Sequence, residues 1–253
     1  MADQSRIRFG LLAVVLATAH FGCAASAVRP PNPGTHISGE ELEAREPAPP
    51  NERYYVLVFG SQSKPLRPKY THSWVTAVRV VDQGPGQQPL VEASTISWMP
   101  ATLDIHPWRF KVEPGVNLEV CTTVKEMLKN DERVSLWGPY EVRRGLYLKL
   151  RMQKDFMDGG TIGYQTIDSV GEARHGTGCD CIHAVTDCDS KFDRTEYPLS
   201  RFGDRGSEQM VRQIMERGFV INPCQTHEWL LGPLGIADCP IVKRTYEPSR
   251  RKK

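Results

Sequence analysis

Runs and alternations of apolar residues predict strands in the first half of the chain. Residues 54–61 (YYVLVFGS) form a continuous apolar run, and residues 73–80 (SWVTAVRV) are rich in β-branched and aromatic side chains, as is typical of strands. A turn-rich loop follows, and the next strand is predicted at 91–99, so that 73–99 forms an antiparallel hairpin. Further extended segments are expected at 133–142 and 161–168.

Helical spacing of apolar positions predicts helices at 118–128, 145–157 and 207–217. Asn117 and Ser207 are the expected N-caps of the first and last of these, and Gly218 the expected stop signal. The last segment, 219–253, mixes Pro and Gly with aliphatic residues and is expected to be irregular. Strands and helices alternate too irregularly for a doubly wound parallel sheet, so we predict a single α+β domain over 52–245.

Composition narrows the functional classes. The 253 residues are 40% hydrophobic and 25% charged with a net charge of +2, which argues against collagen, wholesale disorder, a multi-pass membrane protein and a dedicated nucleic-acid binder. The basic tail at 246–253 is expected to be solvated. Neither a phosphate-binding glycine pattern nor a GxSxG motif occurs, so we expect no nucleotide cofactor and no serine-hydrolase chemistry.

The first 27 residues have the pattern of an export signal, in which basic residues precede a short apolar run. Ala25-Ser26-Ala27 fits ordinary cleavage, whereas Gly22-Cys23 is similar to the end of a lipoprotein signal, in which the cysteine is acylated. The Pro-rich segment 28–51 is expected to be a disordered linker. We therefore expect an exported protein of the periplasm or cell envelope, attached to the membrane only if Cys23 carries a lipid anchor.

Reactive side chains are densest at 178–189, which reads GCDCIHAVTDCD. If a helix begins at Ile182, Cys181 lies at its N-terminus, where backbone N–H groups and the helix dipole favour a thiolate. Such a nucleophile needs a base, and His72 is the candidate. Strand alternation places His72 on the face that carries Trp74 and Val78.

These two motifs support a resemblance to a known family. Thr71-His72-Ser73-Trp74 on an early strand, followed by Asp180-Cys181-Ile182-His183-Ala184 at the start of a helix, resembles the circularly permuted papain-like hydrolases. These enzymes are relatives of NlpC-type cell-wall peptidases and of lecithin retinol acyltransferase. The resemblance implies a permuted papain-like α+β fold, with an antiparallel sheet packed against helices.

The resemblance also implies roles for the two residues. His72 would take the proton, and Cys181 would attack an amide or ester carbonyl to form an acyl-enzyme. A third polar residue should orient the histidine from the next strand, where Glu92, Ser94 and Ser97 are available. The substrate would be a peptidoglycan peptide or a lipid acyl group. Asp180 stands where the family commonly has Asn, and its charge opposes thiolate formation.

Two other interpretations of these residues remain open. Cys179, Cys181, His183 and Cys188, with Cys224 and His227 further on, could instead hold a structural zinc ion. The cysteines could also form disulfides, which are compatible with the enzyme: with Cys181 as nucleophile and Cys121 as a core residue, three disulfide pairings are possible among Cys179, Cys188, Cys224 and Cys239. If Cys181 is itself bridged, the protein is a binding or structural module. The alternative function is thus an inactive envelope domain that binds a cell-wall or protein ligand.

Overall fold

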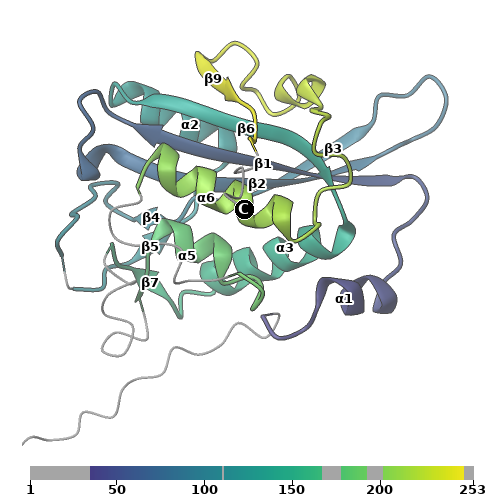
Figure 1. Ribbon diagram of the computed structural model, residues 1–253, viewed down its shortest axis with the longest axis horizontal. Helices are drawn as coiled ribbons and strands as arrows, with labels where there is room; N and C mark the ends of the chain where they lie inside the picture. The colour runs from purple at the N-terminus through teal and green to yellow at the C-terminus, as the bar shows by residue number, and fades with distance from the viewer. Residues whose placement is uncertain (1–34, 110, 167–177, 193–201, 248–253) are drawn as a thin grey trace, which may run out of the picture.

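The fold is built around one five-stranded sheet (Figure 1). The computed structural model describes residues 35–109, 111–166, 178–192 and 202–247. The strand order is β3-β2-β1-β6-β9, where β1 is Glu52–Gln62, β2 Thr71–Val81, β3 Leu90–Ile96, β6 Arg133–Val142 and β9 Ile241–Arg244. β9 is parallel to β6 and the other pairs are antiparallel. The α+β class is confirmed, but the sheet is mixed rather than wholly antiparallel.

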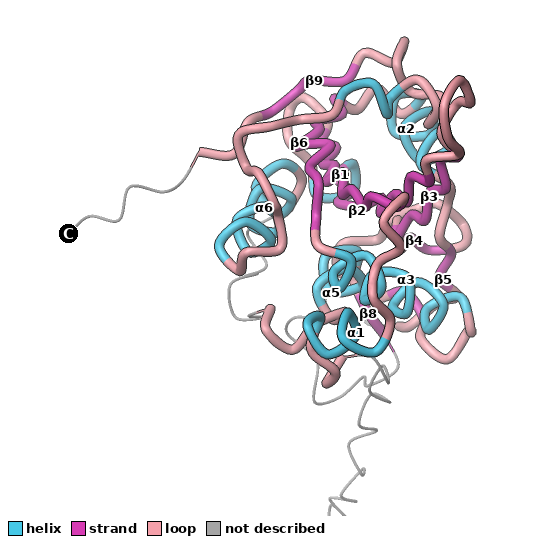
Figure 2. The backbone as a smooth tube through the Cα atoms, turned by 90° about the vertical axis from the view of Figure 1, so that its right-hand side faces the viewer, coloured by secondary structure: helices cyan, strands magenta, loops and turns pink. Residues whose placement is uncertain are grey.

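Helices lie on both faces of this sheet (Figure 2). The helices are α1 Gly39–Arg45, α2 Val120–Lys129, α3 Arg144–Asp158, α5 Cys181–Thr186 and α6 Asp204–Glu216, with 3₁₀ turns η1 Pro68–Tyr70 and η3 Glu228–Leu231. Two small two-stranded sheets pair β4 (Met99–Pro100) with β5 (Gly115–Val116), and β7 (Gly163–Tyr164) with β8 (Gly178–Cys179). α2 and η3 cover one face, and α3, α5 and α6 cover the other.

The alternation of β2 divides the core into two clusters. One, the α5 face, contains Val75 and Ala77 together with apolar residues of α3, α5 and α6. The other, the α2 face, contains Trp74 and Val78 together with apolar residues of α2 and η3. Successive side chains of a strand point to opposite faces, so neighbours in sequence belong to different cores. Both faces of the central strands are buried, which explains the long apolar run of β1.

The expectation of a disordered linker over 28–51 is wrong for its second half, which contains α1. Ser38 caps this helix by accepting a hydrogen bond from the Glu41 amide at 3.0 Å. Gly145 of α3 lies directly against Gly39, because a Cβ on Gly145 would lie 2.5 Å from the Gly39 carbonyl oxygen. The Glu43 carboxylate also accepts a hydrogen bond from the Gly145 amide at 2.6 Å. α1 is therefore docked on α3 by close backbone packing and a hydrogen bond.

Both predicted N-caps are wrong, although the helices are where the apolar spacing placed them. Asn117 lies before α2 and accepts a hydrogen bond from the Ser97 amide at 3.0 Å, while Glu119 is the N-cap. Ser207 lies inside α6, which begins three residues earlier, at Asp204, with Gly203 as its N-cap. Gly218 does follow the helix, with a φ of 71°.

The C-terminal segment is also more regular than expected, because it contains η3 and β9. Of the strand predicted at 161–168, residues 167 and 168 lie outside the described part of the chain, and within 161–166 only the two residues of β7 form a strand. The export signal, Cys23 and most of the basic tail lie outside the described residues. Among the helices of the described residues, none has the length and apolar character needed to cross a membrane.

Candidate functional site

Cys181 is the first residue of α5, as the sequence predicts, and the helix begins there because Asp180 caps it. The Asp180 carboxylate accepts hydrogen bonds from the amides of Ile182 and His183 at 2.9 and 2.7 Å. Its second oxygen lies 2.9 Å from Nδ1 of His183, whose side chain is almost fully buried. Asp180 therefore occupies the donors at the helix terminus and places a negative charge beside the sulfur.

The surroundings of Cys181 oppose a thiolate. Burial, and then the charge of Asp180, raise the pKa of the Cys181 thiol to about 12, although backbone hydrogen bonds from Ser73, Cys181 itself and Ile182 act in the opposite direction. The two raising effects together outweigh the benefit of the helix terminus. At neutral pH, this cysteine is a protonated thiol.

His72 is fully buried at the start of β2, on the α2 face. Its ring stacks on Trp74 with centroids 5.3 Å apart, and Trp74 stacks in turn on Phe59 at 5.0 Å. Neither ring nitrogen has a hydrogen-bond partner among the described residues. Burial lowers the pKa of His72 to about 3, so its imidazole is neutral over the physiological range.

The structure does not bring the two predicted catalytic side chains together. Cys181 packs on the α5 face, next to the backbone of Ser73. The Ser73 hydroxyl also points to that face, where it lies 2.7 Å from the Ser207 hydroxyl of α6. His72 precedes Ser73, so its ring points to the opposite face, where Trp74 lies. The sheet backbone separates the imidazole from the sulfur, and the predicted Cys181–His72 pair is not formed.

The three candidates for an orienting residue also lie elsewhere. Pairing of β2 with β3 ends at Val75 and Ile96, so the described ladder places no β3 residue opposite His72. Glu92 forms an ion pair with Arg79 at 2.8 Å. Ser97 accepts a hydrogen bond from the Leu118 amide at 2.9 Å, before α2. Glu92 and Ser97 thus connect neighbouring elements, and Ser94 lies opposite Ala77 in the β2–β3 register.

A buried ion pair close to α5 was missed by sequence reasoning. Lys149 Nζ lies 3.1 Å from the Asp189 carboxylate, with side chains 0% and 2% exposed. The same ammonium donates to the carbonyl oxygens of Thr35 and Cys188 at 3.3 and 3.4 Å. It thereby joins α3 to the segment after α5 and to the chain before α1. Helical spacing could have revealed it, because Lys149 falls on the same face as Leu146 and Leu150.

The metal and disulfide interpretations also find no support here. Within the ranges described by the structure, no three His, Cys, Asp or Glu side chains are grouped so as to hold a metal ion. Cys224 is exposed, whereas Cys179 and Cys188 are buried on the α5 face. No disulfide joins the six cysteines from Cys121 to Cys239, all of which are among the described residues.

Two hollows lie outside the Cys181 region. The first, of about 440 Å³, is an open groove between the end of α1, the start of β1 and the start of α3. Its lining holds three arginines and three glutamates, together with Tyr54 and the exposed Ile221: Glu43, Ala48, Glu52, Arg53, Tyr54, Glu141, Val142, Arg143, Arg144 and Ile221. Mixed charges beside an aromatic ring suit a ligand that carries both charges itself.

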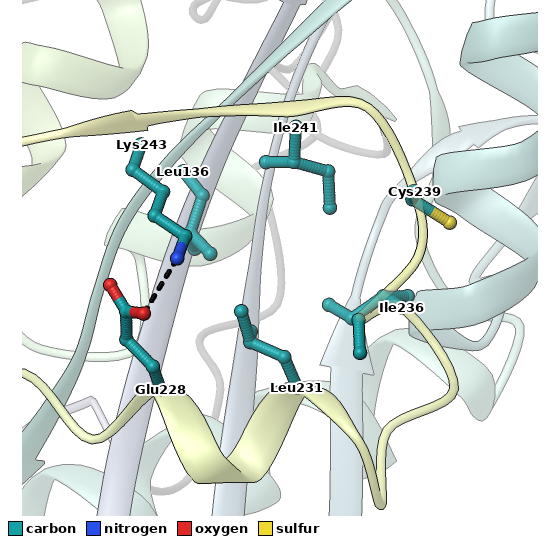
Figure 3. A pocket seen from close by; sticks show the side chains of 8 residues that line it. Leu136, Glu228, Leu231, Ile236, Cys239, Ile241 and Lys243 are labelled. Atoms are coloured by element: carbon teal, nitrogen blue, oxygen red, sulfur yellow. Dashed lines mark hydrogen bonds and ion pairs between the residues drawn. The ribbon is translucent and has the colours of Figure 1, made fainter.

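The second hollow, of about 230 Å³, lies between η3, β6 and β9 (Figure 3). Leu136, Leu231, Ile236 and Ile241 form its apolar lining. An ion pair between Glu228 and Lys243, at 2.6 Å, closes one side. It contains no residue of the predicted catalytic pair.

Comparison of the chain with protein-family models, with curated proteins and with solved structures gives no match. The functional assignment therefore depends on the geometry of the described residues alone.

Proposed function

We propose that the chain is an exported, non-catalytic domain of the cell envelope that binds a peptide ligand, built on a permuted papain-like architecture. The order of elements supports this architecture, since the strand that begins with Thr71-His72 precedes the helix that begins at Cys181, and α5 packs on that strand. The catalytic function of such folds requires an activated thiol with a base in reach. This domain has lost that function.

The observation that carries the proposal is the environment of Cys181. A thiol with a pKa of about 12 is ionised to only about one part in 10⁵ at pH 7, by the definition of the pKa. The imidazole that would have to deprotonate it points to the other face of the sheet. Asp180, which replaces the amide common in the family, adds repulsion to any thiolate. All three features act against nucleophilic attack by the sulfur.

The groove beside α1 is the proposed binding site. Arg53 and Arg143 are exposed and can donate charge-assisted hydrogen bonds to a ligand carboxylate. Arg144 is already held, because its side chain donates to the Tyr54 hydroxyl at 3.0 Å and to Glu46 at 3.1 Å. Glu141 is the carboxylate of the lining that suits a ligand ammonium group, because Glu43 accepts from the Gly145 amide and Glu52 is paired with Arg79. Short cell-wall peptides carry both groups, which is why we favour them over lipid acyl chains.

Thiol reactivity tests the absence of catalysis. The native protein is treated with iodoacetamide at pH 7.5, and labelling of each cysteine is followed by peptide mass spectrometry. We expect exposed Cys224 to react first and Cys181 to react slowest of the exposed and half-buried cysteines. Cys181→Ser confirms the peptide assignment. If Cys181 reacts faster than Cys224, the sulfur is activated and the proposal fails.

One observation favours a thiol hydrolase as the second candidate function. The backbone N–H groups of Ser73, Cys181 and Ile182 lower the pKa of the Cys181 thiol, and so act in favour of its thiolate. In that case Cys181 is the nucleophile, and a base other than His72 serves it. Fast labelling of Cys181 that is unchanged in His72→Ala would select this candidate, whereas slow labelling removes it.

Titration calorimetry with a soluble peptidoglycan stem tripeptide tests the binding site. Loss of a charge-assisted hydrogen bond costs about 1.5–3 kcal/mol, so Arg143→Ala should weaken binding at least about tenfold. Lys129→Ala is the matched control, since it removes a 73%-exposed cation on α2, away from the groove. Absence of binding, or equal weakening in both variants, would exclude this groove.

A further inference from the structure

The C-terminal segment forms one wall of the hollow in Figure 3, and Cys239 stands at its corner. In that view the Cys239 sulfur points out of the hollow, away from Leu136 and Leu231. Cys239 is half-buried and packs on the same core cluster as α2.

Cys121, in the first turn of α2, lies against the same segment. Its sulfur donates to the carbonyl oxygen of Gly235 at 3.4 Å. A Cβ built on Gly235 would lie 3.6 Å from that sulfur, so the backbone there is in van der Waals contact with it. Gly235 adopts a φ of 69°, and the next turn joins the Cys239 amide to the Ile236 carbonyl at 3.3 Å. Cys239 therefore follows Gly235, the residue that contacts Cys121, by only four positions, and a turn lies between them.

Electrostatic contacts indicate that Cys239 faces the side of α2 that carries Cys121. Burial raises the pKa of the Cys239 thiol, the charge of Cys121 raises it further, and Lys125 lowers it. Cys121 and Lys125 are four residues apart on α2 and therefore share one helix face. Both act on Cys239, so the thiol lies near that face. The nearby ammonium of Lys125 favours the thiolate that disulfide exchange requires.

We propose that Cys121 and Cys239 form an intramolecular disulfide under oxidising conditions. The reaction is exchange with a disulfide such as oxidised glutathione. One thiolate attacks the glutathione disulfide and releases one glutathione thiolate, and the second protein thiolate then displaces the other. The two protein thiols are oxidised by two electrons, the glutathione disulfide is reduced to two thiols, and the two protons pass to the released glutathione.

This bridge is a different pairing from those considered from sequence, where Cys121 was expected to be a core residue. It would link the segment that carries η3 and β9 covalently to α2, and so hold Cys239 in place at the edge of the hollow. β9 is a short edge strand held by four register pairs with β6. The bridge would therefore secure the element with the fewest other attachments in the sheet. The inference is independent of the proposed peptide binding.

The test uses the full chain, purified reduced and then oxidised with glutathione disulfide without denaturant. Remaining thiols are alkylated, and the protein is digested and mapped without reductant. We expect one linked peptide pair containing Cys121 and Cys239, with a mass lower by two hydrogens than the sum of the reduced peptides. Cys224, exposed and outside the pair, should remain alkylated or carry a single glutathione.

The thermal midpoint gives a second readout. The bridged protein should melt roughly 5–10 °C higher than the reduced protein, as a disulfide closing a long loop predicts. Cys121→Ser and Cys239→Ser should each abolish this difference, whereas Cys224→Ser should leave it intact. Alkylation of both Cys121 and Cys239 after oxidation, or a linked peptide joining either to another cysteine, would overturn the proposal.

Discussion

Replacement of Glu132 by Gln should change how stability depends on pH. Glu132 is 5% exposed, lies between α2 and β6, and accepts a hydrogen bond from the Ser61 hydroxyl at 2.6 Å. Burial raises the pKa of this carboxyl from 4.5 to about 7, although the Ser61 hydrogen bond acts in the opposite direction. The folded protein therefore holds a proton that the unfolded chain releases between these pH values.

The sign and size of the effect follow from this difference. The folded state binds more protons than the unfolded state between pH 4.5 and about 7, so stability falls as pH rises through this window. At about 1.4 kcal/mol per pKa unit the loss is at most about 3 kcal/mol, and solvent screening reduces it to about 1–3 kcal/mol. Glu132→Gln removes the titrating group while its amide oxygen can still accept from Ser61.

Urea unfolding followed by tryptophan fluorescence at pH 5, 6, 7 and 8 measures the effect. Between pH 5 and pH 8, the free energy of unfolding of the wild type should fall by about 1–3 kcal/mol relative to that of Glu132→Gln. His72 contributes the opposite slope, because burial lowers its pKa to about 3 and its stabilising contribution is lost as pH falls below about 6.5. The free energy of unfolding of Glu132→Gln should therefore increase as the pH rises from 4.5 to 6.5. Parallel pH profiles for wild type and variant would refute the assignment.

Two further substitutions test the packing around α3. Lys149→Met should destabilise the fold by about 3–5 kcal/mol, measured by urea unfolding, because it leaves the Asp189 carboxylate buried without its partner; a loss below about 1 kcal/mol would contradict a buried ion pair. Gly145→Ala should detach α1, since its Cβ would overlap the Gly39 backbone, and should speed hydrogen exchange in α1. Gly232→Ala, where the nearest atom lies 3.8 Å away, is the matched control, and equal exchange in both variants would refute the close contact.

Local patterns in the sequence predicted most of the elements of the sheet. β1, β2 and β6 lie at the expected apolar runs, and α2 and α3 at the expected helical spacings. β9 was missed because the strand with which it pairs, β6, lies about a hundred residues earlier in the chain. A four-residue parallel edge strand contains too little local pattern to be distinguished from loop.

α1 was missed because the surrounding prolines dominated the interpretation of its segment. The stretch Ser38-Gly39-Glu40-Glu41 nevertheless begins like a capping box, and Ser38 does cap the helix. A seven-residue helix has little stability by itself, so its formation depends on docking to Gly145. Composition could not reveal that contact.

The site shows where strand alternation stops being informative. Alternation correctly placed His72 on the face of Trp74 and Val78. It could not say which face α5 would cover, because that choice is made by tertiary packing. α5 covers the other face, so a correct local inference led to an incorrect pair. The raised pKa of Cys181 was signalled in part by Asp180, whose charge was visible in the sequence.

The ionisation of Cys181 tests the proposed absence of catalysis most directly. It can be measured as the rate of iodoacetamide labelling at Cys181 from pH 6 to 10, read by mass spectrometry with free N-acetylcysteine as an internal reference. A thiol with a pKa of about 12 should show a rate that rises throughout this range without a plateau. A plateau with a midpoint below pH 8 would show an activated thiolate and contradict a non-catalytic domain.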